Sequence, residues 1–293
     1  MRVFVTGASG FVGSEVVAEL IEAGHQVSGL TRSAAGAQAL EAMGAAAHHG
    51  SLDDLDGLKR GAEQADGVIH LAFNHDFSTY QANCEDDRRV IAALASVLAG
   101  KPLLVTSGTG MGAAGPGRLA LETDPPASTA ASPRAASEEA ADAAAAQGVR
   151  ACVVRLPQVH DPERQGLITY AVQAAREKGV SAYVGEGTGR WAAAHRLDVA
   201  RLYRLALEQA QPGARYHAVA EEGVPMRAIA ETVGRRLGVP VRSIAPDEAA
   251  AHFGWLAMFA AADAPASSAL TRERLGWTPT GPGLLEDLAR LPL

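Results

Sequence analysis

The stretch TGASGFVG, from Thr6 to Gly13, restricts the fold more than any other part of the sequence. It follows the apolar run RVFVTG, which predicts a β-strand, and it opens a helical pattern, SEVVAELIEAG. Glycines at this junction permit a tight turn, close approach of the backbone to a ligand and close packing of helix on strand. This order is typical of a loop that binds the diphosphate of a dinucleotide. The residues predicted to contact the dinucleotide here are Gly7, Ser9, Gly10, Phe11, Val12 and Gly13.

Apolar runs that predict strands alternate with Ala- and Leu-rich helical patterns through the first half of the chain. The runs lie at 2–7, 26–32, 67–72, 102–108 and 150–157, and the helical patterns at 14–24, 34–44, 86–100 and 132–148. Strands that are apolar throughout suit a parallel sheet covered on both faces. Alternating strands and helices build such a sheet through right-handed crossovers. The sequence therefore predicts an α/β fold, a doubly wound parallel sheet of the Rossmann type.

The pattern loosens after Pro157, which predicts a change in architecture. We expect a dinucleotide-binding domain over residues 1–160, with 190–222 completing its sheet. Residues 161–189 and 223–293 are expected to form a small C-terminal substrate-binding cap.

The composition indicates which ligands suit this fold. The 293 residues are 47% hydrophobic and carry a net charge of -7, which argues against nucleic acids and anionic membranes as partners. No apolar run reaches the roughly 18 residues of a membrane span, and the first residues lack the order of a signal peptide. A cytoplasmic protein that binds a small molecule is expected. The adjacent His48 and His49 point to opposite faces of an extended segment, so no metal site is predicted.

The end of the second predicted strand indicates which dinucleotide is bound. It reads GLTRS, so Arg32 and Ser33 stand where NAD-binding chains usually carry an acidic residue. A guanidinium can pair with a 2′-phosphate, so NADP (NADPH) is the predicted cofactor, although Arg32 would equally suit a solvated loop. The other residues predicted to line the cofactor are Ser51 and Leu52 after the third strand, and Leu71, Ala72 and Phe73 after the fourth.

The ordered motifs of the chain resemble the short-chain dehydrogenase/reductase superfamily, specifically its extended and atypical members. The motifs are TGASGFVG, GVIHLA, LLVTSGTGMG, VVRLPQVHDP, HRLDVARLYRLALE and LTRERLGWTP, and they span nearly the whole chain. The resemblance implies that Pro157 and Val159 also line the cofactor. It also implies a Ser or Thr after the fifth strand, which falls on Ser107, and a Tyr-x-x-x-Lys at the start of the next helix.

The Tyr and Lys of that pattern are absent. If the lysine position falls on Arg134, the tyrosine position is Ala130; if the tyrosine position falls on Arg134, the lysine position is Glu138. An atypical subgroup with His-x-x-x-Arg would match Arg134 but not Ala130. In both registers Arg134 lies in the first turn of a helix that begins near Ser132 and Pro133, facing the expected nicotinamide.

Three residues are therefore predicted to be catalytic: Ser107, Arg134 and His160. Arg134 stays protonated, so it suits charge stabilisation or an exposed helix start better than proton donation. His160 follows the sixth strand and titrates near neutrality, which suits a proton donor, and a purely structural histidine is the alternative. Trp191, Trp255 and Phe259 are candidates for an apolar substrate site or for plain packing.

These observations favour an NADP-dependent oxidoreductase that transfers hydride between NADPH and a small carbonyl, imine or related substrate. The alternative is a non-catalytic NADP(H)-binding sensor or regulatory protein. A sugar-nucleotide epimerase or dehydratase ranks lower, because those reactions rely on the absent Tyr and Lys. Close packing of the alanines in helix 135–147 would permit a homodimer, whereas its acidic residues would equally suit a solvent face.

Overall fold

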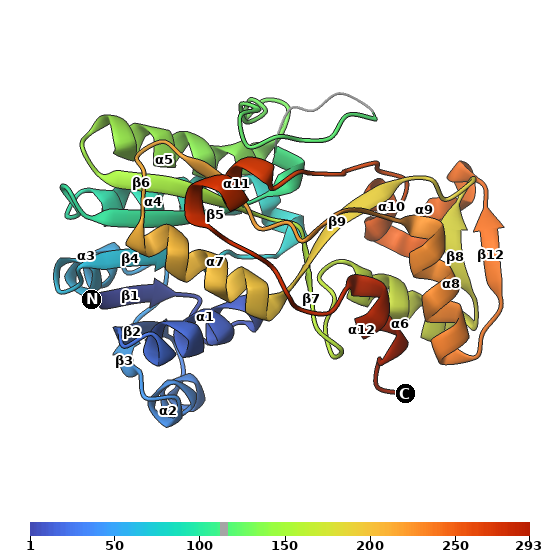
Figure 1. Ribbon diagram of the computed structural model, residues 1–293, viewed down its shortest axis with the longest axis horizontal. Helices are drawn as coiled ribbons and strands as arrows, with labels where there is room; N and C mark the ends of the chain where they lie inside the picture. The colour runs from blue at the N-terminus through green and yellow to red at the C-terminus, as the bar shows by residue number, and fades with distance from the viewer. Residues whose placement is uncertain (112–116) are drawn as a thin grey trace.

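The computed structural model describes residues 1–111 and 117–293 and shows a larger and a smaller lobe (Figure 1). The larger lobe holds a parallel sheet in the order β10-β6-β5-β4-β1-β2-β3. Its strands are β1 (Arg2–Thr6), β2 (Gln26–Thr31), β3 (Ala46–His49), β4 (Gly67–His70), β5 (Pro102–Gly108), β6 (Arg150–Leu156) and β10 (Arg215–His217). The predicted doubly wound Rossmann fold is confirmed. Gly112, the last residue of the LLVTSGTGMG motif, lies outside the described residues.

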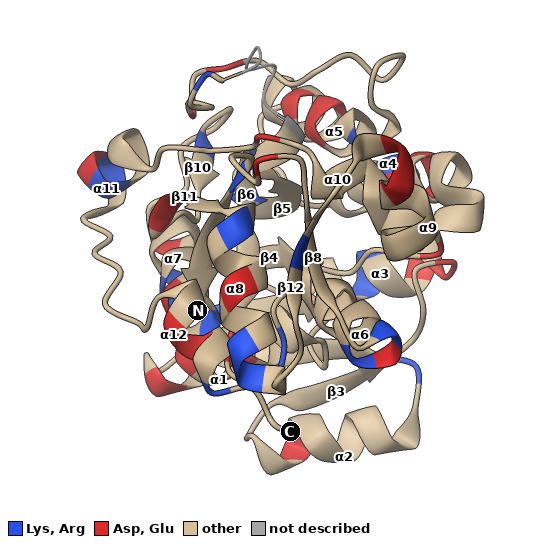
Figure 2. Ribbon diagram, turned by 90° about the vertical axis from the view of Figure 1, so that its right-hand side faces the viewer, with Lys and Arg blue, Asp and Glu red and all other residues tan. Residues whose placement is uncertain are grey.

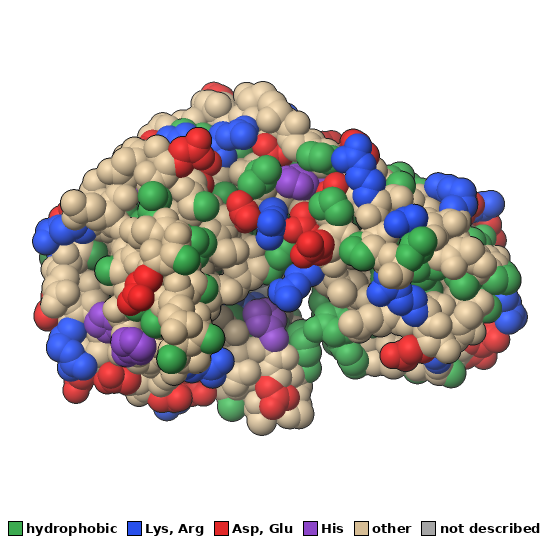
Figure 3. All heavy atoms as spheres, turned by 90° about the horizontal axis from the view of Figure 1, so that it is seen from below, with side chains coloured by type: hydrophobic (Ala, Val, Ile, Leu, Met, Phe, Trp, Pro, Cys, Tyr) green, Lys and Arg blue, Asp and Glu red, His purple; other side chains and the backbone are tan. Residues whose placement is uncertain are grey.

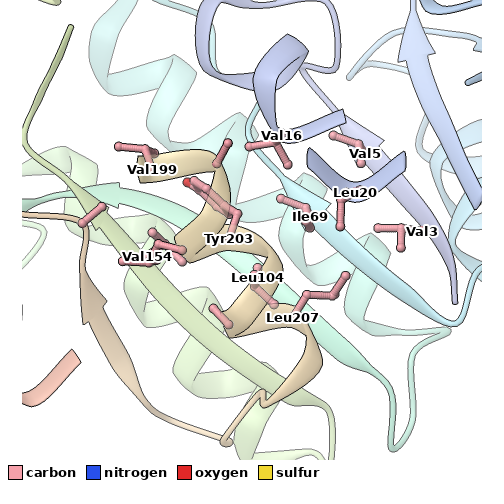
Figure 4. Packing of buried hydrophobic residues seen from close by; sticks show 14 of the residues in the cluster. Val3, Val5, Val16, Leu20, Ile69, Leu104, Val154, Val199, Tyr203 and Leu207 are labelled. Atoms are coloured by element: carbon pink, nitrogen blue, oxygen red, sulfur yellow. The ribbon is translucent and has the colours of Figure 1, made fainter. Parts of the chain in front are cut away.

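Helices cover both faces of this sheet, and the central strands β1, β4 and β5 bury nearly all of their side chains, as a sheet covered on both faces requires. The helices are α1 (Phe11–Glu22), α2 (Ala34–Ala42), α3 (Leu55–Glu63), α4 (Tyr80–Ala95), α5 (Ala136–Ala146) and α7 (Arg196–Glu208). Figure 4 shows one face, where Val16 and Leu20 of α1 and Tyr203 of α7 pack onto strand residues such as Ile69. A second cluster, which includes Leu58 of α3, Ile91 of α4 and Ala141 of α5, forms the core on the opposite face.

The smaller lobe is the C-terminal cap, and it has a core of its own. It contains α6 (Ile168–Lys178), β8 (Ser181–Val184), α8 (Met226–Leu237), β12 (Val241–Ile244), α9 (Ala249–Phe253), α10 (Ala257–Ala260) and α12 (Leu284–Ala289). A separate sheet in the order β11-β9-β7 joins the lobes; its strands are β7 (Gln158–His160), β9 (Arg190–His195) and β11 (Glu221–Pro225). Figure 2 views the cap end and shows acidic and basic segments interspersed over it.

Two segments differ from the expected division of the chain. Within 190–222, β10 joins the main sheet, but β9 pairs with β7 and β11 instead. Within 223–293, α11 (Ala269–Leu275) and Trp277 return to the larger lobe. The buried indole of Trp277 donates to the backbone oxygen of Asp198 at 2.9 Å, and this apolar anchor explains why the segment leaves the cap.

None of the described helices combines the length and the apolar character needed to cross a bilayer.

Candidate active site

The glycine loop joins β1 to α1 in a geometry that excludes side chains. Gly7 has φ +71°, and a Cβ atom there would lie 2.8 Å from the backbone nitrogen of Ala72. A Cβ atom on Gly13 would lie 2.0 Å from the Gly7 oxygen, so the turn and the first helical turn touch backbone to backbone. Gly10 closes the turn by donating its N–H to the Gly7 oxygen at 2.9 Å. As the N-cap of α1, Gly10 has no side chain to occupy the free N–H groups of the first turn, which suits an anion there.

Arg32 lies exposed directly after β2. It has no ion pair or side-chain hydrogen bond with any residue in 1–111 or 117–293. Its neighbour Ser33 caps α2, because its hydroxyl accepts the Gly36 N–H at 3.1 Å. A free guanidinium beside a helix N-terminus forms a suitable site for a phosphate group.

The remaining residues predicted to line the cofactor lie at the ends of neighbouring strands. Ser51 turns the chain after β3 by accepting the Asp53 N–H at 3.2 Å, and Leu52 is half-buried. Leu71, Ala72 and Phe73 follow β4 and are all half-buried. Pro157 is half-buried between β6 and β7, whereas Val159 is buried in the core beneath the sheet edge. Ser9, Phe11 and Val12 surround the glycine loop, where Ser9 is exposed and the other two are half-buried.

Arg134 lies in the short 3-10 turn Pro133–Ala135, which runs directly into α5. One terminal nitrogen of its guanidinium donates to Asp87 Oδ2 at 2.7 Å and to the Ser137 hydroxyl. The other donates to the backbone oxygen of Thr106 at 3.0 Å. The guanidinium carbon also lies 3.9 Å from the ring centroid of Phe73, within cation–π range. Arg134 therefore joins α4, β5 and the segment after β4 at one point.

A buried hydrogen-bond relay extends from this point to the glycine loop. Asp87 Oδ1 accepts from His70 Nε2 at 2.9 Å, and His70 Nδ1 lies 2.7 Å from the Thr6 hydroxyl. Thr6 in turn accepts the Ala72 N–H at 3.3 Å. Burial opposes ionisation of Asp87, but His70, Arg134 and Ser137 outweigh it and lower its pKa to about 2. The sequence motifs place Thr6 and His70 at strand ends, but no periodicity in the sequence indicates that Asp87 of α4 faces them.

Ser107 ends the apolar part of β5 with its side chain buried. Its hydroxyl forms no hydrogen bond of normal geometry to the described residues, although it lies close enough to Glu138 to help lower the pKa of that carboxyl. The strongest partner of Glu138 is Arg155, at 2.8 Å to each carboxylate oxygen, and Arg215 adds a contact at 2.9 Å. Burial alone would raise the Glu138 pKa, but these two cations lower it. Sequence reasoning missed Arg155, whose position in an apolar strand gives no signal of a buried charge.

His160 lies in β7 with its side chain fully buried. Its Nδ1 lies 2.7 Å from Asp287 Oδ2 of α12, and its Nε2 has no partner among the described residues. Burial lowers the pKa of His160 more than Asp287 raises it, which favours the neutral ring. His195 packs edge-on against it, with 5.8 Å between the ring centroids, and caps α7 through its Nδ1. This enclosure favours a role in holding α12 to the β11-β9-β7 sheet over proton donation to a substrate.

Two further arginines flank the glycine loop and were not singled out from the sequence. Arg196 lies 5.4 Å and Arg164 lies 6.0 Å from the ring centroid of Phe11. Arg196 is paired with Asp161 at 2.9 Å and with Glu15 at 3.0 Å. A cavity of about 270 Å³ beside them is lined by Asp161, Pro162, Glu163, His195, Arg196 and Leu197. From below, Figure 3 shows a notch between the two lobes with hydrophobic and basic side chains at its rim.

Known proteins share sequence and fold with this chain. Residues 3–220 match the family described as the NAD dependent epimerase/dehydratase family. The chain is 48% identical to the uncharacterized protein C2A9.02 of Schizosaccharomyces pombe over 99% of this chain and 98% of that protein. It is 45% identical to the uncharacterized protein YLL056C of Saccharomyces cerevisiae, over 98% of each chain.

Solved structures show the same fold. The dTDP-glucose 4,6-dehydratase DesIV of Streptomyces venezuelae, solved with NAD bound, superposes with a TM-score of 0.79 at 21% identity, over 99% of this chain and 95% of that one. The UDP-glucose 4-epimerase of Thermus thermophilus, in complex with NAD, has a TM-score of 0.76 at 21% identity, over 99% and 97%. At this level of identity the likeness concerns the fold alone.

Proposed function

Because the chain belongs to the NAD dependent epimerase/dehydratase family, within the extended short-chain dehydrogenase/reductase superfamily, we propose that it is an NADP-dependent reductase or dehydrogenase. Its reaction transfers hydride between NADPH and a small carbonyl, imine or related substrate. Membership confirms the resemblance identified from the motifs. The family and its relatives indicate NAD(P)-dependent oxidoreductase, epimerase or dehydratase chemistry, and the choice among these is the proposal.

The glycine cradle fits a dinucleotide, since added Cβ atoms at Gly7 and Gly13 would meet backbone atoms and fill it. The choice of NADP is supported by the position and the free charge of Arg32. It is exposed at the end of β2, beside the N-terminus of α2, and the described residues offer it no acidic partner. A carboxylate at this point would bind ribose hydroxyls and repel a 2′-phosphate, whereas a free guanidinium attracts that phosphate.

The roles that follow rest on the hydrogen bonds of the site. When bound, NADPH supplies hydride. Arg134 uses three of its five N–H groups on Asp87, Ser137 and Thr106, which leaves two to stabilise negative charge on a substrate oxygen. In the proposed reaction, Ser107, which pairs with Arg155 of β6 in the sheet, contributes its hydroxyl as a hydrogen-bonding group for the substrate. His160 is assigned to the β11-β9-β7 sheet that joins the lobes, because its ring is enclosed, burial lowers its pKa, and its Nε2 has no partner among the described residues.

The cofactor assignment is tested by measuring NADPH and NADH binding by fluorescence titration, for the wild-type chain and for Arg32→Asp. We expect the wild type to prefer NADPH and Arg32→Asp to lose that preference at least tenfold. Arg242→Asp, at an exposed site on β12 in the cap, controls for the change of charge alone. An unchanged preference in Arg32→Asp would contradict the assignment.

The reaction is tested by following NADPH oxidation with a panel of aldehydes, ketones and imines. A second candidate function is a non-catalytic NADP(H) sensor, and one observation favours it. In one of the two registers, Glu138 occupies the position of the absent lysine. Its carboxylate is fully buried in an ion pair with Arg155 and offers no proton. Tight NADPH binding without oxidation on any substrate would support the sensor and overturn the enzyme.

A further inference from the structure

Six aromatic side chains form a continuous cluster, here called the aromatic cluster: Phe73, Phe77, Tyr80, Tyr170, Trp255 and Phe259. Successive ring centroids lie 6.2 Å apart for Phe73 and Tyr80, and 5.6 Å apart for Tyr80 and Phe77. Trp255 follows at 4.8 Å from Phe77, and it contacts Tyr170 at 5.0 Å and Phe259 at 6.3 Å. The chain has only six Phe, five Tyr and three Trp, so this concentration calls for an explanation.

The aromatic cluster joins the two lobes. Phe73, Phe77 and Tyr80 belong to the segment that leaves β4 and enters α4. Trp255 and Phe259 belong to the cap, in the stretch that contains α9 and α10 (Figure 1). The rings of Phe77 and Trp255 stack across the junction with an interplanar angle of 24°. Ligand sites form preferentially at such junctions between domains.

These rings are not buried as a core would be. Phe77 and Trp255 are each 41% exposed and Tyr170 is 45% exposed. By contrast, Trp191 and Trp277 are 4% and 1% exposed, so the other two tryptophans are enclosed in the packed interior. Apolar surface left in water costs about 25 cal/mol per Å², and a gathered patch of this kind marks a contact site.

The aromatic cluster reaches the candidate catalytic groups at one end, because Phe73 stacks on Arg134 with 3.9 Å between guanidinium carbon and ring centroid. We infer that the substrate carries a planar aromatic group that stacks on the exposed side of the Phe77–Trp255 pair, with its reactive carbonyl or imine toward Arg134. This inference rests on the proposed reductase function. Aromatic faces bind other aromatic faces through offset stacking.

Binding measurements test this inference without relying on turnover. The NADP⁺-saturated full chain is titrated with 2-naphthaldehyde and with its saturated analogue decahydro-2-naphthaldehyde, by calorimetry. Both carry one aldehyde group on a bicyclic frame of the same size, and only 2-naphthaldehyde has a planar aromatic face. We expect the aromatic compound to bind at least tenfold more tightly. Trp255 is the one exposed tryptophan among the three, so quenching of tryptophan fluorescence reports contact at this site.

Leucine substitutions separate stacking from plain apolarity. Phe77→Leu and Trp255→Leu keep an apolar side chain but remove the ring. Both are expected to reduce the preference for 2-naphthaldehyde over its saturated analogue to less than about threefold. Met258→Leu changes a neighbouring side chain that is 74% exposed, and it should keep the wild-type preference. Thermal unfolding of each variant verifies that it is folded.

Three outcomes would overturn the inference: equal binding of the two aldehydes, an unchanged preference in both leucine variants, or self-association of the wild type that Phe77→Leu abolishes. The last would identify the aromatic cluster as an interface between copies of the chain. Failure of the proposed reductase function is a different result, in which the aromatic preference persists but NADPH is not oxidised.

Discussion

Asp87 and Arg134 form an ion pair beside the ring of Phe73, with 2.7 Å between Asp87 Oδ2 and Arg134 Nη1. The Asp87 side chain is 2% exposed and that of Arg134 is 14% exposed, so the pair is shielded from solvent. It ties α4 to the first turn before α5, and through His70 it reaches the strand end at the glycine loop. The position of Arg134, on which the proposed chemistry depends, is therefore set by a buried carboxylate on α4.

Replacing Asp87 with Asn should destabilise the fold considerably. Asn keeps the size of the side chain but leaves Arg134 without its counter-charge, and breaking a buried pair costs about 3 kcal/mol or more. The measurement is urea unfolding of the variant against the wild type. Asp86→Asn is the matched control, because Asp86 lies on the exposed face of the same helix and pairs with the exposed Arg89. A surface pair contributes less than about 1 kcal/mol, so similar losses in the two variants would refute the assignment.

The same carboxylate predicts acid sensitivity. The pKa of Asp87 is about 2 in the folded chain and near its ordinary value when unfolded, so its ionised form stabilises the fold above about pH 4. This contribution, about 2 kcal/mol, is lost as pH falls from about 4 through 2. Unfolding free energies measured from pH 6 to pH 2 should fall less steeply for Asp87→Asn. If the unfolding free energies of the wild type and Asp87→Asn fell in parallel with pH, Asp87 would not be the source of the acid sensitivity.

Restoring a lysine at position 138 should not restore the family's Tyr-x-x-x-Lys chemistry. Glu138 is fully buried between Arg155 and Arg215, so Glu138→Lys would gather three cations in one buried place. We expect this variant to be unfolded or insoluble. Glu138→Gln keeps hydrogen-bonding capacity and is expected to fold with a loss of about 3–5 kcal/mol. Circular dichroism and solubility distinguish the two, and a well-folded Glu138→Lys would contradict the observed pairing.

His160 is expected to contribute to stability rather than to proton transfer. Because burial lowers its pKa, the neutral ring favours the folded state above about pH 6.5, and stability falls as pH drops below that value. His160→Asn should lower the unfolding midpoint and leave the shape of the pH–rate profile between pH 6 and 8 unchanged. A profile that loses a limb near neutrality in His160→Asn would identify His160 as the proton donor after all.

Gly13→Ala should disrupt the glycine loop, because its Cβ atom would lie 2.0 Å from the Gly7 oxygen and both atoms belong to backbone. Forcing an extra carbon into such a contact costs about 1–3 kcal/mol, and displacement of the loop should weaken NADPH binding at least tenfold. Gly110→Ala, where an added Cβ atom meets no atom of the described residues within 4 Å, is the control for binding and folding. Unchanged NADPH affinity in Gly13→Ala would contradict the role of this loop.

The fold could be predicted from the sequence because its signals are local. The buried strands and the glycine loop between strand and helix depend on neighbouring residues, and both agree with the structure. The helix expected from Pro133 begins as the 3-10 turn Pro133–Ala135, and α5 itself starts at Ala136. The assignment of segments to the two lobes depends on longer-range contacts. Trp277 leaves the cap for the larger lobe because a long-range burial site accepts its indole, and no pattern within 223–293 indicates that.

The sequence by itself determined the Rossmann sheet, the dinucleotide loop and the absence of the Tyr-x-x-x-Lys pattern, since these follow from residue types in consecutive order. Only the tertiary structure decided what surrounds Arg134 and His160. Asp87 lies 47 residues from Arg134, and Asp287 lies 127 residues from His160. The charge and exposure of a side chain depend on such distant partners, and packing alone brings them together.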